Sequence, residues 1–118
     1  MAELDPITAT IASGQSLSGA VSIANKTLVG IVIPANWTTA SLSFQASGDG
    51  GTTFGELLDE TATAKSVSSI TGGAYTVIAV DPTKWRGITS LKVRSGTSGA
   101  AVNQTNTVNL VLLTRMVF

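Results

Sequence analysis

The chain has 118 residues with seven acidic and seven basic side chains, so its formal net charge is zero, and only 12% of its residues are charged. It contains neither Cys nor His, which excludes disulfides, thiolate metal sites and the side chain most often used for proton transfer near neutral pH. A surface with so few charges has no field that would attract polyanions, so we expect no nucleic-acid partner. The length suits a single domain over residues 1–118.

We expect neither a leader peptide nor a membrane partner. Residues 1–6 are acidic and end in Pro6, whereas a signal peptide begins with basic residues and an apolar stretch. We interpret them as a short N-terminal extension. No run reaches the ~18 apolar residues of a membrane span, and the most apolar stretch, residues 110–118, is predicted to be a buried strand.

The first half of the chain has the period-two pattern of β-strands. In residues 7–11 and 21–23, apolar and polar side chains alternate, as in a strand that covers a core on one face. Residues 28–33 are apolar on both faces, which predicts burial on both sides, in the sandwich centre or at a subunit contact. Residues 42–47 alternate again, and residues 54–59 read as a strand and its exit.

The second half continues this pattern. Residues 77–80 and 108–113 are apolar on both faces, and we expect two-sided burial there too. Residues 91–94 alternate. Between them, residues 81–86 predict a short helical turn, because Asp81 can cap it and Pro82 suits its first position.

Turn-forming residues separate these segments at short intervals. The strongest turn is Gly48-Asp49-Gly50-Gly51, since Asp-Gly and Gly-Gly supply the positive φ angles of tight hairpins. A calcium-binding loop is the alternative there, but calcium is coordinated by six to eight oxygen atoms and this turn has a single carboxylate. Eight or nine short strands at this spacing predict an all-β protein, an antiparallel β-sandwich of jelly-roll type.

Residues with catalytic potential are few, and we expect no enzyme. Glu56, Asp59 and Glu60 form an acidic cluster that a glycosidase could use as paired carboxylates, but acids that solvate a strand and turn explain them more simply. Several serines precede residue 20, yet without His no Ser-His-Asp arrangement exists. We therefore assign no catalytic, cofactor-binding or metal-binding residues.

Trp37 and Trp85 have two interpretations. Exposed indoles stack on sugar rings, so either could belong to a carbohydrate-binding module. Their positions, after a strand end and in the predicted helical turn, better suit plugs that close the sandwich, with each indole N–H bonded to backbone.

The order of several segments resembles a family of small jelly-roll structural proteins of tailed bacteriophages, the head decoration or cement proteins. The segments are residues 10–18 (TIASGQSLS), 28–37 (LVGIVIPANW), 42–54 (LSFQASGDGGTTF), 81–87 and 91–97 (LKVRSGT). Each segment alone is ordinary strand and turn sequence, and their order carries the resemblance.

The resemblance implies a non-enzymatic virion protein that binds the assembled shell and bridges capsomers. The resemblance implies that its partner is the major capsid protein and that it is a homotrimer. It also implies that the protein is made in the host cytoplasm and ends on the outer surface of the capsid. Many such proteins anchor by a long arm, whereas only six residues precede Ile7 here, which favours docking by the sandwich itself. Another virion component, such as a head–tail, tail or fibre module, is the main alternative.

Apolar residues at the chain ends and after residue 33 are candidate subunit contacts. The alternative is that they complete the core of their own fold. These residues are Met1, Leu4, Ile7, Pro34, Trp37, Met116 and Phe118.

Overall fold

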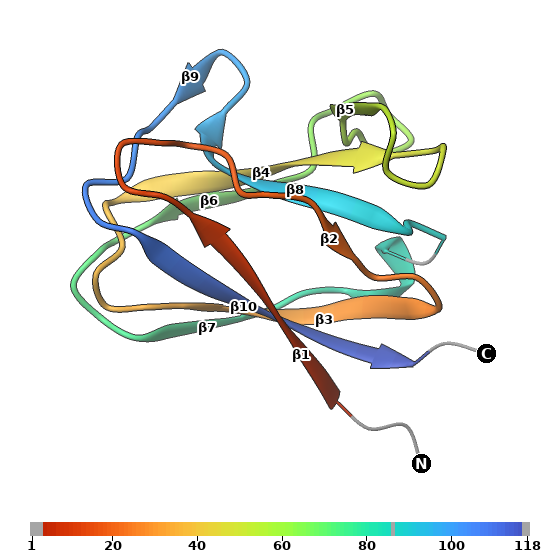
Figure 1. Ribbon diagram of the computed structural model, residues 1–118, viewed down its shortest axis with the longest axis horizontal. Coiled ribbons are helices and arrows are strands. Elements are labelled where there is room, and N and C mark those ends of the chain that lie inside the picture. Colours follow the sequence, from red (N-terminus) through yellow and green to blue (C-terminus); the bar gives the residue numbers. More distant parts are fainter. Residues whose placement is uncertain (1–3, 86, 117–118) are drawn as a thin grey trace.

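Two antiparallel sheets lie face to face in the computed structural model, which describes residues 4–85 and 87–116 (Figure 1). The four-stranded sheet contains, in order, β1 (Leu4–Ile11), β10 (Val108–Met116), β3 (Lys26–Ile33) and β7 (Thr76–Ala79). The six-stranded sheet contains, in order, β2 (Val21–Ser22), β8 (Ser90–Thr97), β4 (Ala40–Ser47) and β5 (Phe54–Glu56). In that sheet β6 (Ser66–Ile70) also pairs with β4, and β9 (Ala100–Ala101) pairs with β8.

The strand pairs are nested, so that strands from the two ends of the chain meet. β1 pairs with β10, β2 with β8, β3 with β7 and β4 with β6, and every pair is antiparallel. This winding of a long hairpin into two sheets is the jelly roll that the sequence predicts. The short strands β5 and β9 are additions to it, which brings the count to ten.

The core fills the space between the sheets with aliphatic side chains. One row crosses the four-stranded sheet through the register Ile7, Leu112, Ile31 and Ile78, and its central members are fully buried. Opposite them, the six-stranded sheet contributes Leu42, Phe44, Leu91 and Val93, all without exposed area. Each such side chain contributes about 1.5–3 kcal/mol through burial.

The predicted helical turn is confirmed. A 3₁₀ helix, η1 (Pro82–Lys84), follows Asp81, whose carboxylate accepts bonds from the Thr83 amide (3.1 Å) and hydroxyl (2.8 Å). These bonds lower the pKa of Asp81. Trp85 follows the turn directly and packs edge-on against Phe44, with ring centroids 4.9 Å apart.

The glycine-rich turn is a hairpin, as predicted. It joins β4 to β5, whose register begins at Ser47 and Phe54. The Asp49 carboxylate accepts bonds from the Ser47 hydroxyl (2.7 Å) and the Thr53 amide (2.8 Å). The Thr53 amide is the main cause that lowers the pKa of Asp49 to about 2.

The structure differs from the sequence-based expectations in two places. Residues 66–70 form an unpredicted strand, β6, whereas residues 54–59 form a strand that ends at Glu56 and its exit, as expected. Within this chain, residues 77–80 and 108–113 are buried on one side only: Val77 on the edge strand β7 is 57% exposed, and Val111 and Leu113 are partly exposed. Burial of their outer side at a subunit contact stays a prediction. Two-sided burial does hold for most of β3.

Candidate functional site

Two rows of side chains cross the outer face of the four-stranded sheet. The register that aligns the four strands places eight residues there, none of them charged, and we call them the aliphatic face. They are Thr8, Val111, Val32 and Val77 in one row, and Pro6, Leu113, Gly30 and Ala79 in the next.

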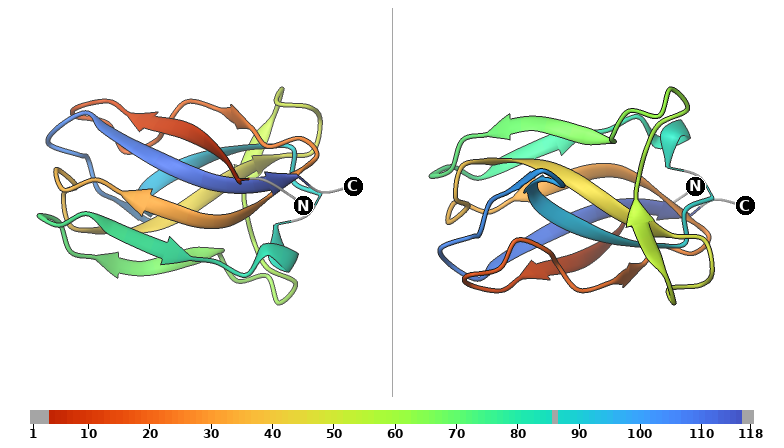
Figure 2. Two further views of the ribbon diagram at one scale, coloured as in Figure 1. Left: turned by 90° about the horizontal axis from the view of Figure 1, so that it is seen from below. Right: turned by 90° about the horizontal axis from the view of Figure 1, so that it is seen from above.

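The aliphatic face is uncovered in the isolated chain. Figure 2 (left) shows this sheet from its outer side, with no other described segment crossing it. Val77 is more than half exposed, and Val111 and Leu113 are partly exposed. Gly30 provides space for Leu113, since a Cβ at that glycine would lie 3.2 Å from the Leu113 Cδ1 atom. Alternate residues of these apolar runs therefore line the sandwich centre, and the residues between them form this outer surface.

Polar groups border the aliphatic face at both ends. At one end the Thr10 hydroxyl donates to the Asn109 side-chain oxygen (2.7 Å). At the other end Arg115, which pairs in register with Leu4, is exposed. An apolar area with a polar border is typical of a protein contact surface.

The outer face of the six-stranded sheet has the opposite character. Arg94 and Glu56 form a two-pronged ion pair there, with N–O distances of 2.7 and 3.1 Å. The ammonium group of Lys92 lies 4.6 Å from the Phe54 ring centroid. This face therefore carries charges, whereas the aliphatic face does not.

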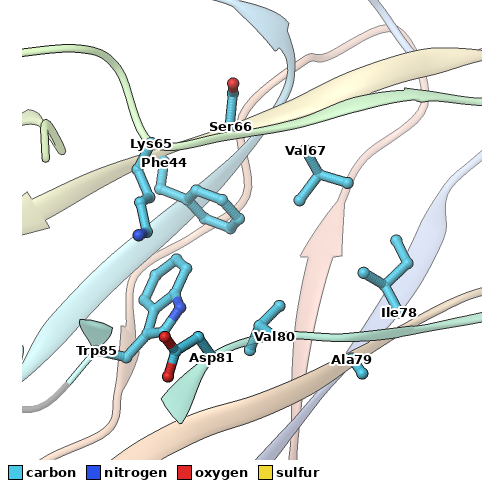
Figure 3. Close-up of a pocket in the computed structure, with 9 residues that line it drawn as sticks. All are labelled: Phe44, Lys65, Ser66, Val67, Ile78, Ala79, Val80, Asp81 and Trp85. Carbon is cyan, nitrogen blue, oxygen red and sulfur yellow. The ribbon is translucent and has the colours of Figure 1, made fainter. Parts of the chain in front are cut away.

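A groove of about 270 Å³ opens between the edge strands β6 and β7 (Figure 3). Its walls include Val67, Ile78 and Val80, with Trp85 at one end. The Lys65 ammonium lies 5.9 Å from the Trp85 ring centroid. The volume falls slightly below the ~300–1,000 Å³ of typical small-molecule sites, and we assign it no ligand.

The candidate subunit contacts divide into three groups. Leu4 and Met116 lie at the surface, 57% and 39% exposed. Ile7 and Pro34 are partly buried, and Ile7 packs against the core. Trp37 belongs to the core itself at 3% exposure, which agrees with the alternative that it completes the core of its own fold. Met1 and Phe118 lie outside the described residues.

Both tryptophans are plugs rather than platforms. Trp37 and Trp85 are only 3% and 2% exposed, so neither indole can stack on a sugar at the surface. The expected backbone partner is missing for one of them, because the Trp37 indole N–H has no hydrogen-bond acceptor among the described residues.

The acidic cluster has structural roles. Glu56 is engaged by Arg94, and Asp59 accepts bonds from the Thr61 amide and hydroxyl (2.8 and 2.6 Å). The Thr61 hydroxyl is the main cause of a lowered pKa at Asp59. Within residues 4–85 and 87–116, no three carboxylates gather in a group that could hold a metal ion. In the same ranges, no helix is long and apolar enough to cross a membrane.

No protein-family model matches the chain, and no curated protein matches it. A solved structure with some likeness is the crystal structure of the Yersinia pseudotuberculosis-derived mitogen. It shares 13% sequence identity, over 100% of this chain and 88% of that chain, with a TM-score of 0.36. A likeness this distant carries no argument about function, which depends on the chain's own surface.

Proposed function

We propose that the chain is a virion structural protein of a tailed bacteriophage, a decoration protein that binds the assembled capsid shell and bridges adjacent capsomers. The ordered likeness of its segments to that family supports the proposal, and the jelly-roll fold agrees with it. The implied partner is the major capsid protein.

The observation that carries the proposal is the aliphatic face. A row in which Val77 and Val111 reach the surface on either side of the buried Val32 is costly to leave in water, since each Å² of apolar area covered contributes about 25 cal/mol. Such a face suits a protein that works inside a protein assembly. The rival reading as a carbohydrate-binding module depended on an exposed Trp37 or Trp85, and both indoles are buried.

A decoration protein needs only a modest interface for each copy. Many copies on one shell act collectively, because each bound copy positions its neighbours. Binding the assembled shell but not free capsid subunits stabilises the shell by mass action. The low charge of this chain, 12% of residues with a net charge of zero, limits repulsion between crowded copies.

The test uses shells of the phage that encodes the chain, assembled without it. Purified chain is added to these shells and, as a control, to dissociated capsid protein; binding is measured by co-sedimentation and located by cryo-EM. We expect saturable binding to shells only, with threefold clusters of density on the outer surface. Absence of both binding and outer density overturns the proposal. Density in a sixfold or twelvefold ring would place the chain in the neck or tail instead.

A further inference from the structure

We infer that the aliphatic face is covered by the same face of a second copy of this chain, in a two-fold, face-to-face pairing of the two four-stranded sheets. This inference goes beyond the proposed function and does not depend on it, because the pairing forms in solution without a shell.

The charge distribution favours a second copy as the occupant. The two rows contain only aliphatic side chains, a glycine and the hydroxyl-bearing Thr8. A partner surface that fits them should therefore also carry no charge. The face itself is such a surface, and pairing it with itself buries no ionic group. The nearest charge on the same side of the sheet is that of Arg115, which pairs with Leu4 in the row next to Pro6 and Leu113 and is exposed at the margin.

The composition of the face also fits a permanent contact. Interfaces between permanently associated copies resemble a protein core and contain few charges. Surfaces that form non-permanent complexes are about as polar as the rest of the protein surface. The outer face of the six-stranded sheet, with Arg94, Glu56 and Lys92, has that second character.

The area of the sheet is sufficient when the margins of the face also take part. Three strands of eight or nine residues and the four-residue β7, spaced ~4.8 Å apart, cover roughly 440 Å² on each copy. Two copies then bury about 900 Å², just under the ~1,000 Å² of a specific interface. Leu4 and Tyr75, 57% and 72% exposed at the margins of this face, must therefore contribute.

Symmetry decides which residues approach each other. In a two-fold contact the same surface is used by both copies, and packed sheets lie about 10 Å apart with strands within ~30° of alignment. The axis then passes near the central strands β3 and β10, which places Val111 of one copy close to Val111 of the other. Val77, on the edge strand β7, lies towards the margin.

The first experiment measures the mass of the full chain by size-exclusion chromatography with light scattering over a range of concentrations. We expect twice the chain mass of 12.0 kDa. Val77→Lys places a charge at the margin of the contact, and we expect the dissociation constant to rise at least ~10-fold. Ser68→Lys, at an exposed position on β6 of the other sheet, is the matched control and should leave the mass unchanged.

The second experiment does not depend on weakening the contact. Because the chain has no Cys, Val111→Cys introduces a single thiol. With a short bis-maleimide cross-linker, which can join two thiols on sheets ~10 Å apart, we expect a covalently linked dimer, and Ser68→Cys should remain largely unlinked. A monomeric wild-type chain, a trimer, or a dimer that neither Val77→Lys weakens nor Val111→Cys links overturns the inference.

Discussion

Arg94 and Glu56 lie 38 residues apart in the sequence and form a two-pronged ion pair on the outer face of the six-stranded sheet. The side chain of Arg94 is only 8% exposed, and that of Glu56 is 23% exposed. One guanidinium nitrogen of Arg94 also donates to the Ser43 hydroxyl at 3.0 Å. The pair links β8 to β5 across β4.

Removing one partner of this pair should destabilise the fold strongly. In Glu56→Ala the buried guanidinium of Arg94 loses its carboxylate, and we expect the free energy of unfolding to fall by about 2–4 kcal/mol. Urea denaturation followed by tryptophan fluorescence measures the change. The double variant Arg94→Met/Glu56→Ala removes both charges and should recover at least half of the loss. A double variant as unstable as the single one would contradict this account.

Gly72 cannot accept a side chain, because a Cβ there would lie 1.9 Å from the Trp37 carbonyl oxygen. That oxygen belongs to backbone, so the loops must move to relieve the clash. We expect Gly72→Ala to lower the free energy of unfolding by about 2–3 kcal/mol, in the range of overpacked sites. Gly19→Ala, where a Cβ meets nothing within 4 Å, is the control and should change stability by less than about 1 kcal/mol.

Gln104 ties two loops together at the end of the sandwich. Its fully buried amide donates to the Ser95 hydroxyl (2.7 Å) and the Thr38 carbonyl (3.1 Å), and accepts from the Thr38 amide (2.7 Å). Gln104→Met keeps the volume but removes all three bonds, and we expect a loss of about 2–4 kcal/mol. Hydrogen exchange at the Thr38 amide should also become faster. Gln15→Met, at an exposed position, should show neither effect.

Asp49 should make stability depend on acidity. Its pKa in the folded chain is about 2, below the ordinary 3.8, so the unfolded chain takes up the proton first as the pH falls. The stabilisation by this carboxylate is therefore complete above about pH 4 and is lost as the pH falls towards 2. NMR titration of its side-chain carbon should show the lowered pKa. In Asp49→Asn, the free energy of unfolding should change less between pH 4 and pH 2 than in the wild type.

The fold class could be predicted from the sequence because period-two patterning is a local property. The alternation in residues 7–11 and 42–47 marks strands with one buried face, and both are strands of the sandwich. β6 was missed because its sequence, Ser-Val-Ser-Ser-Ile, offers only Val67 and Ile70 to the interior. A polar strand of this kind is recognisable only once its partner β4 is known.

Features that depend on register could not be predicted. The ion pair of Arg94 with Glu56 forms only because β4 pairs with both β8 and β5, and the sequence does not show these pairings. Gln104 lies among Thr and Asn residues in the sequence and looks like an ordinary loop residue there. The aliphatic face was half anticipated: residues 77–80 and 108–113 are apolar on both sides, but a sequence does not say whether a covering partner comes from the same chain.

The nested strand order has a consequence for synthesis on the ribosome. β10, which emerges after the other nine strands, lies between β1 and β3 in the middle of its sheet. A nascent chain therefore holds β1 without its neighbour, and this sheet cannot close until β10 has left the exit tunnel. The two rows of the aliphatic face are likewise assembled only after β10 has emerged, so a half-made chain has no finished surface with which to capture a completed copy.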